Sequence, residues 1–551
     1  MDPSEPALQL TTSEPTVAAR RAFWNARQDV SKLPVETLVE IFLYLSAPPG
    51  EADEATVSRN GAEWFRLMLV CRRWRAVVKS NPCFWQDIVV TDSIDWWNLA
   101  IARTSTATLR LSFEAGSSPS ESLIPEIMAC RGRIERLVIC GTQSECQWVL
   151  PLVDGSLPSL TSLDIDWDVD NDSEGPYVLN PENYPRLRRL RLADTCLPWT
   201  LSLLGRLRSL QLHYCTTAPA TLPFKEFLEV LQGAPQLEEL ELSDIMSRVC
   251  PYSSLGTTGA QAPGLIHFPR LHDLRVQDAI PWLAEFLARV ELPSRGRIAV
   301  TAIVTPEEVE NELNLSAYAS IFPADPERTP FFRTATRAKL VVENRGAPCW
   351  AISCGAAGPS GFTFKYGFLG DEQHRSWWNS EAQGLSYFTQ LLRGAPLTEL
   401  DLALRIRYLD SPVLRTLIET FPGIQKLRIG QKTESPEMTF PSEIFEAFSG
   451  RSYPRDDDSE TYRHGLSWPH LKTIHIDGIR WKDGEFVPTL LQCLYERAKR
   501  GAPRLEAFLL TVFRTPLEDW TVVDTLIRTT VELFADTYTC DVRPLALPPS
   551  P

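Results

Sequence analysis

The string Pro-x-Leu-x-x-Leu-x-Leu, with other apolar residues at some leucine positions and the proline sometimes missing, recurs in ten copies along this chain. The second and third apolar residues of a copy are two positions apart, so both point to the same side of a β-strand. The first lies in the turn that leads into the strand, and the proline ends the preceding helix. The pattern therefore predicts strands that bury three apolar side chains per copy in one core. The copies begin at Ile134, Leu160, Leu187, Leu207, Leu237, Leu271, Leu397, Ile424, Leu471 and Leu505.

The spacing of the copies favours an irregular repeat array. Several steps are 26 or 27 residues, and others are 20, 30, 34 or 47. Steps of roughly 20 to 29 residues with this apolar pattern resemble those of leucine-rich repeats. Amphipathic segments between the copies predict outer helices, at residues 224–231, 282–290, 386–392, 413–420 and 490–498. The expected fold class is α/β, with an irregular solenoid of parallel strands and outer helices over residues 91–540.

The positions between the second and third apolar residues point away from the core. In a curved solenoid the sheet lines the concave side, which is the usual binding face. Mixed charge at these positions suits a protein or peptide partner. The sequence therefore predicts a substrate face at Asp164, Arg191, Gln211, Glu241, Arg275, Asp401, Arg428 and His475.

Residues 306–380 break the repeat period. Segments 337–342, 350–354 and 362–368 are typical of short strands with polar or Gly-Pro links. The pattern leaves two alternatives open, degenerate repeats or a small sheet inserted in the array.

The segment before the repeats, residues 31–90, carries two apolar helical runs. Pro34 suits the first turn of one run, and Asn81-Pro82 closes a second run that extends from Trp64 to Val78. Three motifs lie here in order: Leu33-Pro34-x-Glu36-x-Leu38-x-x-Ile41-Phe42-x-x-Leu45, Val70-Cys71-Arg72-Arg73-Trp74-Arg75 and Pro82-x-Phe84-Trp85. Together they resemble an F-box domain, a small all-α helical bundle. The link at residues 46–61 is longer than in the compact family pattern.

The whole chain resembles F-box proteins with degenerate leucine-rich repeats, of which fungi have large sets. This resemblance implies a substrate-recognition subunit of an SCF-type cullin–RING ubiquitin ligase. The F-box would bind the ligase's adaptor protein, and the repeats would bind an unknown protein substrate. Two alternatives stay open: a non-degradative complex, and an interaction scaffold with a decayed F-box. The resemblance puts Leu33, Pro34, Glu36, Leu38, Ile41, Phe42, Leu45, Val70, Cys71, Trp74 and Trp85 in the F-box core and its adaptor-binding face.

Composition and missing motifs exclude other classes. The formal charge of −15 argues against nucleic acid or an anionic membrane as partner. No apolar run approaches a membrane span, and the first residues do not match a secretory signal, so we expect a cytoplasmic or nuclear protein. The twelve cysteines form no C-x-x-C pair. No phosphate-binding loop or nucleophile motif occurs, and the alternating aspartates from Asp164 to Asp172 lack the glycine and glutamate of a calcium loop. We therefore expect a non-catalytic chain without a cofactor or metal, with flexible tails at residues 1–30 and 541–551.

Overall fold

The computed structural model places most of the chain in two compact units, Met1–Pro198 and Trp199–Pro551. The division falls inside the segment expected to form one solenoid. Most of both expected tails, the loop at residues 47–61 and most of segment 306–336 lie outside the described residues. The structure describes residues 24–25, 27–46, 64–114, 123–142, 147–168, 179–195, 201–216, 221–251, 265–293, 296–304, 321–323, 325–343, 349–356, 361–368, 380–404, 411–430, 445, 467–480, 486–514 and 521–544.

The first unit begins with short helices. They are η1 (Asp29–Lys32), α2 (Val35–Ser46), α4 (Trp64–Val70), α5 (Arg72–Ser80) and η2 (Pro82–Phe84). Helix α2 begins at Val35, so Pro34 lies just before the helix and not in its first turn, where the sequence placed it. The prediction of one continuous second run is wrong, because Cys71 adopts an extended backbone (φ −155°, ψ 169°) between α4 and α5. Its Sγ accepts a hydrogen bond of 3.4 Å from the backbone N–H of Trp74 and so caps α5.

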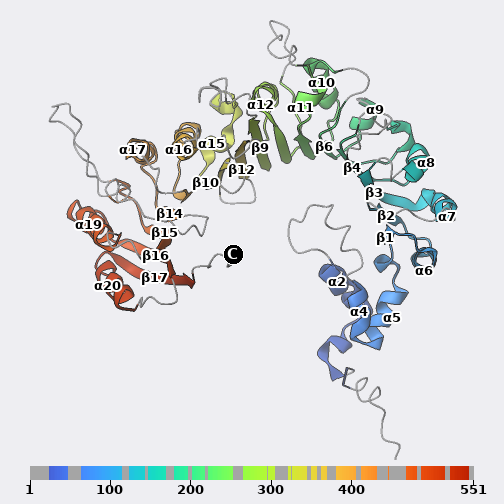
Figure 1. Cartoon of the computed structure of the whole chain (residues 1–551), viewed down its shortest axis with the longest axis horizontal. Helices are drawn as coiled ribbons and strands as arrows, with labels where there is room; N and C mark the ends of the chain where they lie inside the picture. The colour runs from blue at the N-terminus through green and yellow to red at the C-terminus, as the bar shows by residue number, and fades with distance from the viewer. Residues whose placement is uncertain are drawn as a thin grey trace, which may run out of the picture. The chain divides into compact units, whose positions relative to one another are not determined.

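A parallel sheet of five strands follows in the first unit, paired in chain order from β1 to β5. Helices α6, α7 and α8 lie on one face of it (Figure 1). The strands are β1 (Asp87–Val90), β2 (Leu109–Phe113), β3 (Ile134–Thr142), β4 (Ser162–Asp168) and β5 (Arg189–Ala193). The helices between them are α6 (Ile94–Thr104), α7 (Leu123–Ala129), η3 (Arg131–Arg133), η4 (Gln147–Val149), α8 (Leu150–Asp154) and η5 (Pro181–Asn183).

The second unit continues the alternation of strands and helices, and its helices α10, α12, α16 and α17 lie on one face of its sheet (Figure 1). Its strands are β6 (Ser209–His213), β7 (Glu239–Ser243), β8 (Asp273–Ala279), β9 (Arg297–Val304), β10 (Arg337–Glu343), β11 (Cys349–Gly355), β12 (Gly361–Phe368), β13 (Glu399–Ala403), β14 (Lys426–Gly430), β15 (Thr473–Arg480), β16 (Leu505–Arg514) and β17 (Ala535–Pro544). Its helices are α9 (Leu201–Leu204), α10 (Phe224–Gln232), α11 (Met246–Val249), α12 (Ile280–Leu287), η7 (Pro326–Arg328), α15 (Pro330–Thr334), α16 (Ser380–Leu391), α17 (Ser411–Thr420), α19 (Phe486–Lys499) and α20 (Thr521–Val531).

The predicted register of the repeats is confirmed, because every one of the ten copies forms a strand with its apolar residues buried. In the copy at β5, Leu187 lies in the turn before the strand, and Leu190 and Leu192 point from the strand into the core. The five predicted outer helices are also present, as α10, α12, α16, α17 and α19. The fold is thus an α/β, solenoid-like arrangement.

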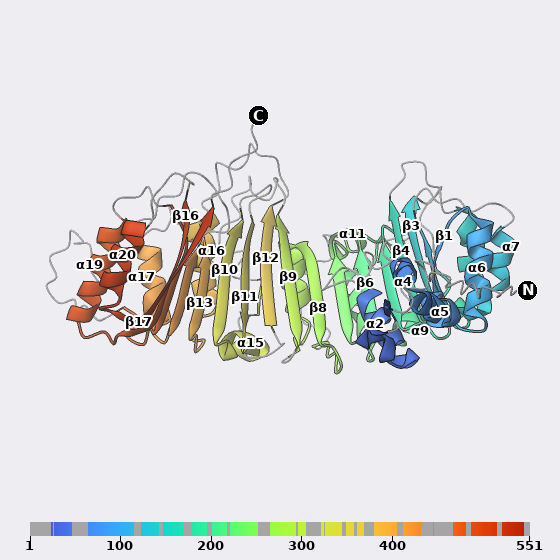
Figure 2. The same cartoon turned by 90° about the horizontal axis from the view of Figure 1, so that it is seen from below.

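The irregular segment forms three strands built into the sheet of the second unit. Strand β12 pairs in parallel with β9, β11 pairs antiparallel with both β12 and β10, and β10 pairs in parallel with β13. Figure 2 shows the resulting spatial order β9, β12, β11, β10, β13. These three strands therefore belong to the same sheet as the repeat strands, and their spatial order β12, β11, β10 is the reverse of their order in the chain.

Candidate functional site

The helices of the first unit expose a large apolar surface. On α2, Tyr44 and Leu45 are 83 % and 57 % exposed, and on α4, Leu69 is 78 % exposed. Val70 at the end of α4 is exposed as well. Exposed groups of large apolar side chains on a soluble protein often mark interaction sites. We call the exposed apolar residues of these two helices the α2–α4 surface: Val35, Ile41, Leu43, Tyr44, Leu45, Leu69 and Val70.

Beneath this surface lies a compact aromatic core. Leu38 and Phe42, one helical turn apart on α2, are fully buried. The ring centroid of Phe42 lies 4.6 Å from that of Trp74 and 6.3 Å from that of Phe84. These contacts bring the three predicted motifs together, because α2, α5 and η2 each contribute one ring.

A second aromatic cluster connects these helices to the sheet of the same unit. Trp85 is buried, and its Nε1–H donates a 2.9 Å hydrogen bond to the carbonyl of Val78. Its ring centroid lies 4.6 Å from that of Trp64 and 6.0 Å from that of Trp96 on α6. The Trp96 Nε1–H donates in turn to the carbonyl of Val89 on β1, at 3.3 Å. The helical segment and the first strand therefore form one packed body.

The start of α2 is held by an arginine inside the second motif. The guanidinium of Arg73 donates hydrogen bonds to the carbonyls of Ser31 and Leu33. These bonds tie α5 to the backbone just before Pro34. Sequence reasoning assigned Arg73 no role, since a second arginine in an arginine-rich motif gives no signal of its own.

The predicted F-box residues divide into three groups by exposure. Leu38, Phe42 and Trp85 are buried, and Leu33, Cys71 and Trp74 are half-buried. Pro34, Glu36, Ile41, Leu45 and Val70 are exposed. Sequence reasoning missed Val35, Leu43, Tyr44 and Leu69 of the α2–α4 surface, although three apolar neighbours at positions 43–45 cannot all face one core and were a usable signal.

The predicted substrate-face residues of the second unit lie in one line across the sheet. Gln211, Glu241 and Arg275 are register partners on β6–β8, and Asp401, Arg428 and His475 are partners on β13–β15. The register continues between these two sets through the strands that lack the repeat pattern. We call the whole line the central row: Gln211, Glu241, Arg275, Ala299, Thr363, Ser353, Lys339, Asp401, Arg428 and His475.

The two predicted residues of the first unit form an internal ion-pair cluster. Asp164 is 7 % exposed, and its Oδ1 accepts a 2.9 Å hydrogen bond from Arg191, which also donates to Asp166 at 3.0 Å. Burial raises the pKa of Asp164, and the charge of Arg191 opposes that shift. These contacts hold β4 to β5.

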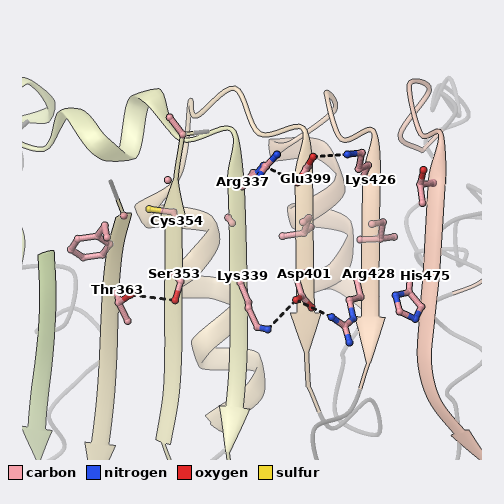
Figure 3. Close-up of a pocket in the computed structure, with 18 residues that line it drawn as sticks. Arg337, Lys339, Ser353, Cys354, Thr363, Glu399, Asp401, Lys426, Arg428 and His475 are labelled. Carbon is pink, nitrogen blue, oxygen red and sulfur yellow. Dashed lines mark hydrogen bonds and ion pairs between the residues drawn. The ribbon is translucent and has the colours of Figure 1, made fainter. Parts of the chain in front are cut away.

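A hollow of about 470 Å³ lies over strands β10–β15 of the second unit (Figure 3). Lys339, Asp401, Arg428 and His475 cross it in one line. Burial, and then the charge of Arg428, lower the pKa of His475, which favours the neutral imidazole. Its Nε2 lies 3.2 Å from Oγ1 of Thr511. Sequence reasoning missed Lys339 because β10 belongs to the inserted strands.

Two further features were sought in the described part of the chain, a metal site and a membrane-spanning helix. No three His, Cys, Asp or Glu side chains there are placed to hold a metal ion. None of its helices is both long enough and apolar enough to cross a membrane.

Comparison with known families identifies the N-terminal helical segment. The model of the F-box-like family matches residues 30–91. This range contains the α2–α4 surface, both aromatic clusters up to Trp85, and strand β1. No curated protein matches the chain.

Proposed function

We propose that this chain is a substrate-recognition subunit of an SCF-type cullin–RING ubiquitin ligase. The observation that carries the proposal is the F-box-like domain at residues 30–91 with its exposed α2–α4 surface. F-box domains bind the adaptor protein of these ligases, and interface energy usually concentrates in a few apolar anchors. Tyr44, Leu45, Leu69 and Val70 supply such anchors, and Leu38 and Phe42 hold their helix in place from below.

In this role the chain positions the substrate and contributes no catalytic side chain. Trp85 and Trp96 pack the F-box-like helices against β1, so the adaptor-binding surface is fixed relative to the sheet of the first unit. Because adaptor and substrate bind the same chain, the substrate is held at a raised effective concentration near the ligase's catalytic subunits. The central row of the second unit is the surface we propose for the protein substrate.

The proposal predicts that the adaptor and the cullin co-purify with the full-length chain from cells. The double variant Leu45→Asp/Leu69→Asp places two charges on the α2–α4 surface and should remove both partners from the purified sample. A matched control is Val522→Asp/Leu526→Asp, on α20, where the side chains are similarly exposed at 72 % and 54 %. The control should retain adaptor and cullin at the wild-type level.

Circular dichroism must show that both double variants are folded. Undiminished recovery of adaptor and cullin with a folded Leu45→Asp/Leu69→Asp chain would exclude the α2–α4 surface as the docking site. A wild-type chain that recovers neither partner would refute the proposed function itself.

A further inference from the structure

Charge is distributed unevenly over the outward face of the second unit's sheet. On β7 and β8 the outward positions hold three carboxylates and one cation, namely Glu239, Glu241, Asp273 and Arg275. On the strands from β9 to β14 the outward positions with described exposure hold six cations and two carboxylates. The cations are Arg297, Arg337, Lys339, Lys365, Lys426 and Arg428, and the carboxylates are Glu399 and Asp401. A basic area therefore stands out on a chain whose net charge is −15.

Most of the residues that line the hollow belong to this basic area. Glu399 is shared by two cations, with Arg337 Nε at 2.9 Å and Lys426 Nζ at 2.8 Å. This group of three keeps a net charge of +1. The next group along the strands balances Lys339 and Arg428 against Asp401 and Asp477, so the attraction for an anion is centred on Arg337 and Lys426.

Two glycines open the floor of the hollow beside Arg337. Gly355 is the register partner of Arg337, and Gly361 stands at the next position on β12. A methyl group at Gly361 would meet nothing closer than the carbonyl of Cys354 at 4.0 Å. The absence of side chains there leaves room for backbone or side-chain atoms of a ligand between the cations and β9.

We propose that this hollow binds an acidic segment of a protein substrate in an extended conformation. Arg337 and Lys426 lie on β10 and β14, on either side of β13, and both cations contact the carboxylate of Glu399, so their positive charge is concentrated at one place. An acidic side chain of the segment would contact these cations there. The hollow runs across strands β10–β15, which gives an extended segment room to lie along it. The assignment to a substrate rests on the proposed function, whereas the peptide preference is a property of the second unit alone.

The experiment uses the purified full-length chain and a phage-displayed library of random 12-residue peptides. Selection should enrich Asp and Glu. A synthetic peptide of the selected consensus should bind at least tenfold more weakly to Arg337→Gln/Lys426→Gln, which leaves Glu399 unpaired in the hollow. Gly361→Leu, which fills the floor and keeps every charge, should weaken binding by a similar factor.

The matched control is Lys225→Gln/Arg543→Gln, which removes two half-exposed, ion-paired cations on α10 and β17. It should change the affinity less than twofold, and replacing the acids of the peptide by glutamine should abolish binding. Selection without acidic enrichment, or equal binding to wild type and to both folded hollow variants, would overturn the proposal. Tighter, variant-sensitive binding of a 20-nucleotide DNA strand would also overturn it. All these variants should bind the adaptor as tightly as wild type does. If the wild-type chain does not bind the adaptor, the proposed function is refuted, and the peptide preference of the hollow is not affected.

Discussion

Asp278, near the end of β8, links the stability of the second unit to pH. Its side chain is fully buried. Oδ2 accepts hydrogen bonds from the backbone N–H groups of Met246 at 2.8 Å and Ser247 at 3.4 Å, at the start of α11. Burial raises the pKa of Asp278 to about 6, against the lowering effect of these hydrogen bonds, and the charge of Asp244 raises it further.

The direction and size of the pKa shift of Asp278 determine how the stability of the second unit depends on pH. In the unfolded chain the carboxyl titrates near 3.8, so between pH 4 and pH 6 the folded chain holds a proton that the unfolded chain has released. Stability therefore falls as pH rises through this window and is constant above it, as far as this group is concerned. A difference of about 2 pKa units corresponds to about 3 kcal/mol.

Asp278→Asn tests this linkage, because asparagine keeps an oxygen for the N–H of Met246 and does not titrate. Urea unfolding of wild type and variant should be measured at steps from pH 4 to pH 7.5. Relative to wild type, the variant should gain about 3 kcal/mol of unfolding free energy between pH 4 and pH 7. A difference that stays constant over this range would refute the reasoning.

Four further substitutions, one of them a control, test the packing. Trp85→Ala removes a buried indole between the F-box-like helices and α6 and should cost about 3–5 kcal/mol in urea unfolding; a loss under 1 kcal/mol would show that the cluster does not couple them. Leu190→Asp puts an unpaired charge in the core and should unfold neighbouring strands, so a thermal melt like that of wild type would contradict the register. Gly430→Ala brings a Cβ to 2.8 Å from that of Asp477 and should cost about 1–3 kcal/mol, while Gly132→Ala, with nothing within 4 Å, should be near neutral.

The repeat pattern predicted most of the sheet because the apolar residues that recur in each copy are also the residues that the strands bury. In each copy the alternation of apolar residues fixed both the strand and the face that points outward, so six residues of the central row could be named in advance. The inserted strands could not be placed, because β12 pairs with β9 and β10 pairs with β13, each about sixty residues away in the sequence, and no local pattern encodes the antiparallel strand β11 between them. Lys339 and the basic area were missed for this reason.

In the F-box-like segment, too, the sequence pattern did not reveal contacts between residues that are far apart in the chain. Its motifs identified the helices and the buried residues Leu38, Phe42 and Trp85. The break at Cys71 was not predicted, because a cysteine rarely caps a helix and the apolar positions on both sides continue a helical period. The role of Arg73 depends on backbone carbonyls about forty residues away, which sequence spacing does not reveal.

The most direct test of the proposed function is the affinity of the purified full-length chain for the purified adaptor, measured by calorimetry. The account predicts a one-to-one complex with a Kd of about 1 μM or tighter. It also predicts that Leu33→Ala/Pro34→Ala and Leu45→Asp/Leu69→Asp abolish the heat of binding while both variants remain folded. A folded wild-type chain that gives no binding heat at tens of micromolar adaptor would contradict the account.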